Sequence, residues 1–143
     1  MPVGRTLVHT THAGTQGLLA AVRRADSVLT GAFVNAAATL RRVRALGARD
    51  VTIVAMGHEA RERCVEDDLC RALLLARLQG RPFDEAAILP TLRAAPAAAK
   101  FFDPAAEWAP EQDFALCSAV DVIDFAVQLR PQAEGFDALE RAA

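Results

Sequence analysis

Short apolar segments rich in β-branched residues alternate with segments of helical periodicity over the first 57 residues. The predicted strands are Arg5–His9, Ser27–Phe33 and Asp50–Met56. Between them, helices are predicted over Gln16–Arg24 and from an N-cap at Asn35 to a left-handed cap at Gly47. Apolar strands in the order β-α-β-α-β indicate a parallel sheet that is buried on both faces. We therefore expect an α/β fold with a mostly parallel sheet flanked by helices.

The second half of the chain is predicted to be mainly helical. A long helix over Val65–Gln79 is closed by Gly80, and a second helix over Phe83–Ala94 is interrupted by Pro90. Shorter elements follow, namely helical turns at Ala97–Phe102 and Phe114–Ala119 and a strand at Ile123–Leu129. We expect Trp108, in the loop before the last helix, to anchor the packing.

Length and composition narrow the class of protein. The 143 residues suit one domain, and we expect residues 1–130 to form a single α/β domain with residues 131–143 as a peripheral tail. No apolar run approaches the roughly 20 residues that cross a bilayer, and the start lacks the apolar stretch of a secretory signal. We therefore expect a cytoplasmic protein without a membrane partner. Nucleic acid is not an expected partner, because the net charge is −2 and the chain has no tyrosine.

Charge is unevenly distributed along the chain. Residues 1–49 carry seven arginines and one aspartate, whereas residues 50–143 carry nine basic and seventeen acidic side chains. Such a division could serve an anionic substrate together with a divalent metal, or it could reflect solvated helix faces. The three cysteines cannot all pair within one chain and are expected to be free thiols: Cys64, Cys70 and Cys117.

A polar loop is predicted between the first strand and the first helix. It has the sequence Thr10-Thr11-His12-Ala13-Gly14-Thr15. Hydroxyl groups and unpaired amides at a helix N-terminus bind anions, and Gly14 would let a phosphate or sulfonate approach. The loop lacks the Gly-x-x-x-x-Gly-Lys pattern of a P-loop. The alternative is an ordinary strand-to-helix turn capped by threonine.

Three consecutive acids, Glu66, Asp67 and Asp68, open the long helix. Mg²⁺ prefers such hard oxygen ligands and often takes only one or two carboxylates. The alternative is that acids in a first turn simply complement the helix dipole.

Histidines and a late group of polar residues are weaker candidates. His9, His12 and His58 all fall at predicted strand ends, where one could act as a general acid or base, although a lone loop histidine is more often merely exposed. A final cluster consists of Asp113, Cys117, Asp121 and Asp124. Some of its members could be helix caps.

The order of several motifs resembles the 2-phosphosulfolactate phosphatase family. Members have a Thr-Thr-Asn-Gly-Thr-like loop after a strand, which is similar to residues 10–15 here with the asparagine replaced and one residue added. The other matching motifs are Phe33-Val34-Asn35-Ala36, the strand Val51–Met56 ending in Gly57, the pair Glu66-Asp67, and the pattern from Asp113 to Cys117 followed by Asp121.

The resemblance implies an activity and a site. Members of the family are Mg²⁺-dependent phosphatases with an α/β fold that hydrolyse 2-phospho-3-sulfolactate to 3-sulfolactate and phosphate, a step towards coenzyme M. It implies that Glu66 and Asp67 are catalytic and hold Mg²⁺, directly or through water. It further implies that the substrate, a small anionic phosphoester, is bound by Thr10, Thr11, Gly14, Thr15 and Asn35.

The chain also departs from the family pattern. Members are longer and carry an upstream segment with an Asp-Val-Leu-Arg-Ala-Thr-like motif, so the resemblance covers the C-terminal portion of the family domain. The Ala-Gly that follows the Glu-Asp pair in the family's helix is Arg71-Ala72 here. An alternative to the phosphatase is therefore a non-catalytic, truncated member that binds a small anion or associates with another chain, for example as a homodimer.

Overall fold

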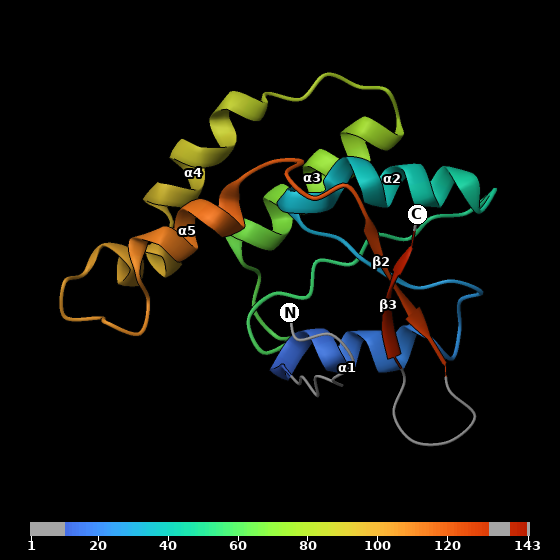
Figure 1. Ribbon diagram of the computed structural model, residues 1–143, viewed down its shortest axis with the longest axis horizontal. Helices are drawn as coiled ribbons and strands as arrows, with labels where there is room; N and C mark the ends of the chain where they lie inside the picture. Colours follow the sequence, from blue (N-terminus) through green and yellow to red (C-terminus); the bar gives the residue numbers. More distant parts are fainter. Residues whose placement is uncertain (1–10, 132–137, 143) are drawn as a thin grey trace.

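The computed structural model of the protein describes residues 11–131 and 138–142. The elements labelled α are α-helices, those labelled η are 3-10 helices and those labelled β are strands (Figure 1). In chain order they are α1 His12–Ala21, β1 Leu29–Thr30, η1 Phe33–Asn35, α2 Ala36–Ala45, α3 Val65–Leu78, η2 Glu85–Ala87, α4 Ile88–Ala94, η3 Pro96–Phe102, α5 Glu111–Ser118, β2 Ala126–Arg130 and β3 Ala138–Ala142.

Most of the predicted helices are present. Asn35 directly precedes α2, and the left-handed glycines expected after α2 and α3 are confirmed at Gly47 (φ +63°) and Gly80 (φ +64°). The segment after α3 divides into η2 and α4 before Ile88, not at Pro90 as predicted. Pro90 instead lies in the first turn of α4, where its missing N–H has no helical partner to lose.

The sheet differs from the expected one. It has three strands in the order β1-β2-β3, and both pairs are antiparallel. Leu29 lies opposite Gln128, and the β2–β3 pair runs from Ala126 opposite Ala142 to Arg130 opposite Ala138. The chain between β2 and β3 is short, and a short connection permits only antiparallel pairing because a parallel pair needs a long crossover. The expectation of a mostly parallel sheet is therefore not confirmed, and β3 was not foreseen.

Of the strands expected in that parallel sheet, Arg5–His9 lies outside the described residues. Residues 51–57 form neither a helix nor a strand, and Val54 remains 66% exposed. Valine and isoleucine favour an extended backbone, but a strand also needs a neighbour with which to exchange hydrogen bonds.

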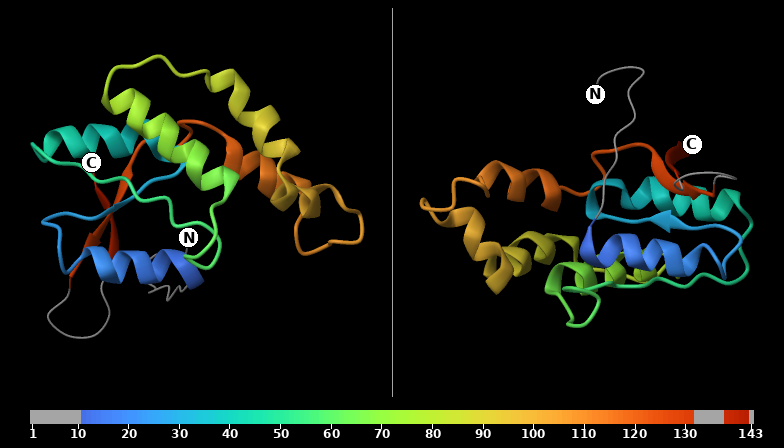
Figure 2. Two further views of the ribbon diagram at one scale, coloured as in Figure 1. Left: turned by 180° about the vertical axis from the view of Figure 1, so that it is seen from behind. Right: turned by 90° about the horizontal axis from the view of Figure 1, so that it is seen from below.

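The hydrophobic core lies among the helices. It is formed by side chains of η1 and α2 to α5, together with one residue of η3: Phe33, Ala36, Leu40, Leu73, Leu74, Ile88, Leu92, Ala98 and Phe114. Figure 1 and Figure 2 show α4 and α5 together on the side of the molecule away from the sheet, and α1 and α2 at opposite ends of the β2–β3 ribbon. Trp108 does not anchor the packing as expected, because its side chain is 74% exposed.

Candidate functional site

Helix α1 begins four residues earlier than predicted, so part of the expected polar loop is helical. Thr11 is its N-cap, with extended backbone angles, and its N–H donates to Oγ1 of Thr15 at 2.9 Å. A Cβ at Gly14 would lie 3.0 Å from Oγ1 of Thr11, so the glycine leaves room for that hydroxyl. The prediction that Gly14 and Thr15 lie in a loop is therefore wrong, and Thr10 lies outside the described residues.

The start of α1 nevertheless keeps the groups that an anion needs. The Thr11 side chain makes no capping hydrogen bond, and the residue is exposed. The N–H groups of the first helical turn have no partners within the helix. A hydroxyl and several amide donors without partners in the helix therefore lie at the positive end of the helix dipole.

Asp67, in the first turn of α3, connects that turn to the end of segment 51–57. Its Oδ2 accepts a hydrogen bond of 2.6 Å from the N–H of Gly57. Gly57 has φ +67°, and a Cβ there would collide with the carbonyl oxygen of Glu62 across the tight turn at residues 58–62. Only glycine fits this position, so the Gly57 N–H is fixed where the Asp67 carboxylate can accept it.

The three acids at the start of α3 have different surroundings. Asp68 is paired with Arg63 at 2.9 Å and faces Arg71 at 3.7 Å, and the hydrogen bond from Arg63 is the main reason that the pKa of Asp68 is lowered. Glu66 makes no hydrogen bond or ion pair with the described part of the chain. Asp67 uses Oδ2 for Gly57, so its Oδ1 and the Glu66 carboxylate are the oxygen atoms that remain.

The oxygens without a partner among the described residues belong to two carboxylates. Mg²⁺ commonly takes one or two protein carboxylates and fills its other positions with water or substrate phosphate. Glu66 and Asp67 can supply that number of ligands. Among residues 11–131 and 138–142 there is no group of three or more His, Cys, Asp or Glu side chains that could enclose a metal. The donor set therefore suits an ion shared with a bound phosphoester better than a site made only of protein ligands.

Two thiols close to these acids are kept protonated. Burial, assisted by the charge of Asp67, raises the pKa of Cys70 to about 11. Burial and then the charges of Glu66 and Asp67 also raise the pKa of Cys64. Neither thiol is a thiolate at neutral pH, so neither has the reactive form of a cysteine nucleophile.

One short link connects the middle of α1 with Asp67. Gly17, in the middle of α1, lies against Met56, because a Cβ at Gly17 would come within 2.5 Å of the Met56 sulfur. Met56 is followed directly by Gly57, which is bonded to Asp67. The two candidate segments that the sequence singled out are thus joined through two consecutive residues.

Asn35 belongs to a different cluster. Its Oδ1 accepts from the N–H of Ala32 at 3.0 Å and makes no cap bond to α2, so the predicted capping contact is wrong although the helix start is correct. Asp121 supplies the cap instead, since its Oδ1 accepts from the N–H of Ala37 at 2.6 Å. No described contact joins Asn35 with Glu66 or Asp67.

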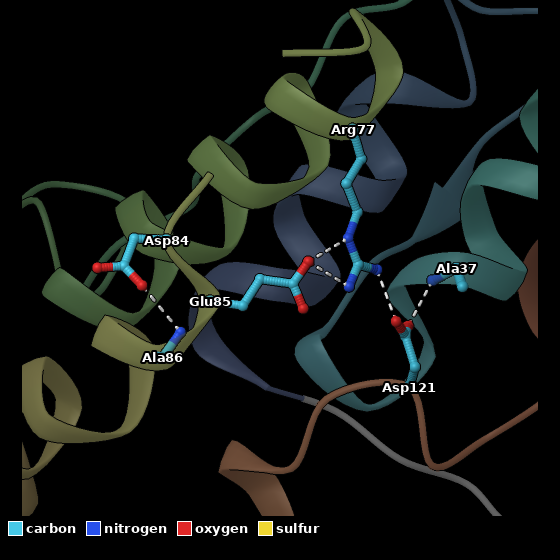
Figure 3. A network of polar contacts seen from close by, with 6 residues as sticks. All are labelled: Ala37, Arg77, Asp84, Glu85, Ala86 and Asp121. Carbon is cyan, nitrogen blue, oxygen red and sulfur yellow. Dashed lines mark hydrogen bonds and ion pairs between the residues drawn. The ribbon is translucent and has the colours of Figure 1, made fainter. Parts of the chain in front are cut away.

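Arg77 completes this second cluster (Figure 3). Its guanidinium donates to Asp121 at 2.6 Å and to Glu85 at 2.7 and 2.9 Å. Burial opposes the charge of Arg77, but the bonds to Glu85 and Asp121 outweigh it and raise its pKa. Arg77 is not among the site residues that the sequence predicts. The available signal was its position on α3, four residues after the buried Leu73 and three after Leu74, where an apolar side chain would be expected.

Comparisons with known proteins identify the family. A family model described as 2-phosphosulpholactate phosphatase matches residues 2–132, so the match includes both the threonine segment and the acids of α3. Searches of curated proteins and of solved structures gave no match. No helix in the described ranges is long and apolar enough to cross a membrane. Because the family model covers nearly the whole chain, the protein belongs to the 2-phosphosulpholactate phosphatase family.

Proposed function

We propose that the protein is a Mg²⁺-dependent phosphatase that hydrolyses 2-phospho-3-sulfolactate or a similar anionic phosphomonoester. In this reaction water adds to phosphorus, the bond between phosphorus and the ester oxygen breaks, and that oxygen takes up a proton. The products are 3-sulfolactate and inorganic phosphate. Family membership supports the class of reaction.

The observation that carries the proposal is the link through Met56 and Gly57. It ties the middle of α1, at Gly17, to Asp67 of α3 through one packing contact with Met56 and one hydrogen bond of 2.6 Å from Gly57. A phosphoester needs both positive donors for its oxygens and an arrangement that tolerates a cation beside them. The two segments supply these complementary requirements from one connected part of the molecule.

Each proposed site residue has a separate task. The first-turn amides of α1, the Thr11 hydroxyl and the Thr10 hydroxyl would bind phosphate or sulfonate oxygens. Gly14 and Thr15 would act by shaping the start of α1 around Thr11. Glu66 and Asp67 would hold Mg²⁺, which when bound would screen the phosphate charge and stabilise the charge that develops during phosphoryl transfer.

Asn35 has a less direct task in this proposal. Its Oδ1 is already bonded to Ala32, so it would shape the start of α2 and leave only its amide nitrogen for a substrate.

The test is phosphate release from 2-phospho-3-sulfolactate by the purified protein, with Mg²⁺ and then with chelator. Asp67→Asn keeps an oxygen acceptor for the Gly57 N–H but removes the charge, so it should lower Mg²⁺-dependent kcat/KM by about 100-fold or more while the protein stays folded. Glu66→Gln should raise the Mg²⁺ concentration needed for half-maximal activity. Asp68→Asn is the matched control, because this acid in the same turn is already paired with Arg63.

The outcomes separate the phosphatase from the alternative. Full activity of Asp67→Asn would remove Asp67 from the site. No release by the folded wild-type protein, together with measurable binding of inorganic phosphate, would favour a family member that binds anions without catalysis. Release that is unchanged by chelator would contradict the proposed dependence on Mg²⁺.

A further inference from the structure

We propose that two copies of this chain associate reciprocally, each placing the Trp108 loop of one copy in a basic hollow beside α1 of the other. The Trp108 loop is defined here as residues 103–113. The hollow lies along α1 from Gln16 onward, and none of its described lining residues is a proposed site residue, so the proposal stands independently of the proposed activity.

The Trp108 loop combines an exposed aromatic ring with negative charge. The Trp108 side chain is 74% exposed, although tryptophan is one of the most strongly buried residues on average. The loop carries four acids and no basic residue: Asp103, Glu107, Glu111 and Asp113. The cations near it are Lys100, whose ammonium lies 5.6 Å from the centre of the indole, and Arg93, which is 3.7 Å from Glu111.

The hollow beside α1 has the complementary character. It has a volume of about 590 Å³ and is lined, in the described ranges, by Gln16, Leu19, Ala20, Arg23 and Arg24. Leu19 is 49% exposed and gives the hollow an apolar centre. Neither arginine forms an ion pair with any residue of the described chain, whereas all three arginines of α2 bond to oxygens of other elements.

The basic charge of the hollow and its apolar centre both favour the Trp108 loop of another copy as the occupant. An indole ring can pack on Leu19 while the guanidinium groups of Arg23 and Arg24 face both the ring and the neighbouring carboxylates. Figure 1 and Figure 2 show α1 and the link between η3 and α5 at different edges of the molecule, so a chain cannot place its own Trp108 loop in its own hollow. A second copy carries the required loop, and two reciprocal contacts close a dimer with two-fold symmetry.

The test measures the mass of the particle by light scattering after size-exclusion chromatography, over a range of protein concentrations. The wild-type protein should dimerise. Trp108→Ala should weaken the dimer at least tenfold, and so should the double variant R23E/R24E and the double variant E107K/E111K, each examined alone. R23E/R24E makes the hollow acidic like the loop, and E107K/E111K removes the net negative charge of the loop and places two lysines near Trp108.

Mixing the two double variants gives the decisive result. The wild-type acidic loop of one partner then meets the wild-type basic hollow of the other, and the two introduced lysines meet the two introduced glutamates, so the mixture should recover a heterodimer with an affinity close to that of the wild type. The control R49E/R81E changes the net charge by the same amount as R23E/R24E, at two exposed arginines outside the hollow, and should leave the dimer unchanged.

Three outcomes would overturn the proposal. They are a wild-type protein that stays monomeric at all concentrations, a dimer unaffected by Trp108→Ala, and a mixture of the double variants that stays monomeric while each variant remains folded. A dimer unaffected by Trp108→Ala would place the interface elsewhere on the molecule.

Discussion

Asp67 illustrates how one side chain can serve both the fold and a site. One carboxylate oxygen holds the Gly57 N–H at 2.6 Å, while the other has no partner among the described residues. Asp68 pairs with Arg63 and lies 3.7 Å from Arg71, whereas Asp67 and Glu66 have no basic partner among the described residues. Besides complementing the helix dipole, these acids make specific contacts, since Asp67 bonds to Gly57 and Asp68 pairs with Arg63.

The Gly57 turn should be highly sensitive to substitution. Gly57→Ala places a Cβ against the carbonyl of Glu62 at φ +67°, so the free energy of unfolding should fall by about 2 kcal/mol or more. Gly47→Ala is the matched control, because it has φ +63° but nothing within 4 Å of the added Cβ, and it should cost only about 1 kcal/mol. Urea denaturation of both variants measures the difference. Equal losses would show that the Glu62 carbonyl does not restrict the turn.

Cys70 should produce a loss of stability at alkaline pH. Its pKa in the folded protein is about 11, above the ordinary value of 9.0, so the unfolded chain loses this proton first as the pH rises. The free energy of unfolding should therefore be unaffected at neutral pH and fall between about pH 9 and pH 11. The chain has no tyrosine to titrate in the same range. Cys70→Ala should flatten this fall, whereas replacement of the exposed Cys117 by alanine should not; the opposite pattern would refute the assignment.

At the scale of elements, helix α2 is started by a residue distant in the sequence. Asp121 caps it through the Ala37 N–H and is itself held by Arg77 of α3, which also bonds to Glu85 at the start of η2. The same junction is extended by backbone bonds from Asp121 N–H to Phe33 and from Ile123 N–H to Val34. The last helix-to-strand connection thereby fixes the position at which α2 begins.

Removal of the Asp121 carboxylate should loosen the start of α2. Asp121→Ala should lower the free energy of unfolding by about 1–2 kcal/mol and speed hydrogen exchange at the Ala37 amide. Asp121→Asn keeps an acceptor and tolerates the left-handed backbone, so it should retain more of the stability. Asp124→Ala serves as control, because Asp124 contributes its backbone carbonyl to Arg41 and no side-chain bond is formed. Equal effects of Asp121→Ala and Asp124→Ala would rule out the cap.

Local signals predicted the helices and their ends better than the sheet. Gly47, Gly80 and the acids of the first turn mark helix boundaries through the conformation of single residues, and these are correct. Strand pairing depends on partners that a local pattern does not identify. Residues 51–57 show this most plainly, since their composition predicts a strand but the segment forms none.

The candidate site could be predicted only in part, again because a local pattern does not identify contacts between distant segments. The position of Glu66 and Asp67 in the first turn of α3 follows from the sequence, whereas the bond to Gly57 depends on a tight turn between them. The start of α1 was placed too late, because threonine and glycine in sequence indicate a loop more strongly than a helix. The roles of Arg77 and Asp121 required knowledge of residues that are 44 positions apart.

At the scale of the whole molecule, the uneven charge has a structural use. The arginines of α2 bond to the Asp124 carbonyl, the Gln128 side chain and the Arg77 carbonyl, so they join α2 to α3 and the sheet and do not form a patch for an anion. In the proposed site the anion is bound instead by the amides and hydroxyls of α1, and the metal beside it is bound by the acids of α3. We propose that these two segments act as one site.

Calorimetric titration of inorganic phosphate, with and without Mg²⁺, tests that claim most directly. If α1 and the acids of α3 form one site, Mg²⁺ should tighten phosphate binding about tenfold or more, and phosphate should tighten Mg²⁺ binding by the same factor. Asp67→Asn should abolish the enhancement and leave binding without Mg²⁺ unchanged, while Asp68→Asn should behave as the wild type. Phosphate binding that is the same with and without Mg²⁺ in the folded wild-type protein would show that α1 and the acids of α3 do not form one site.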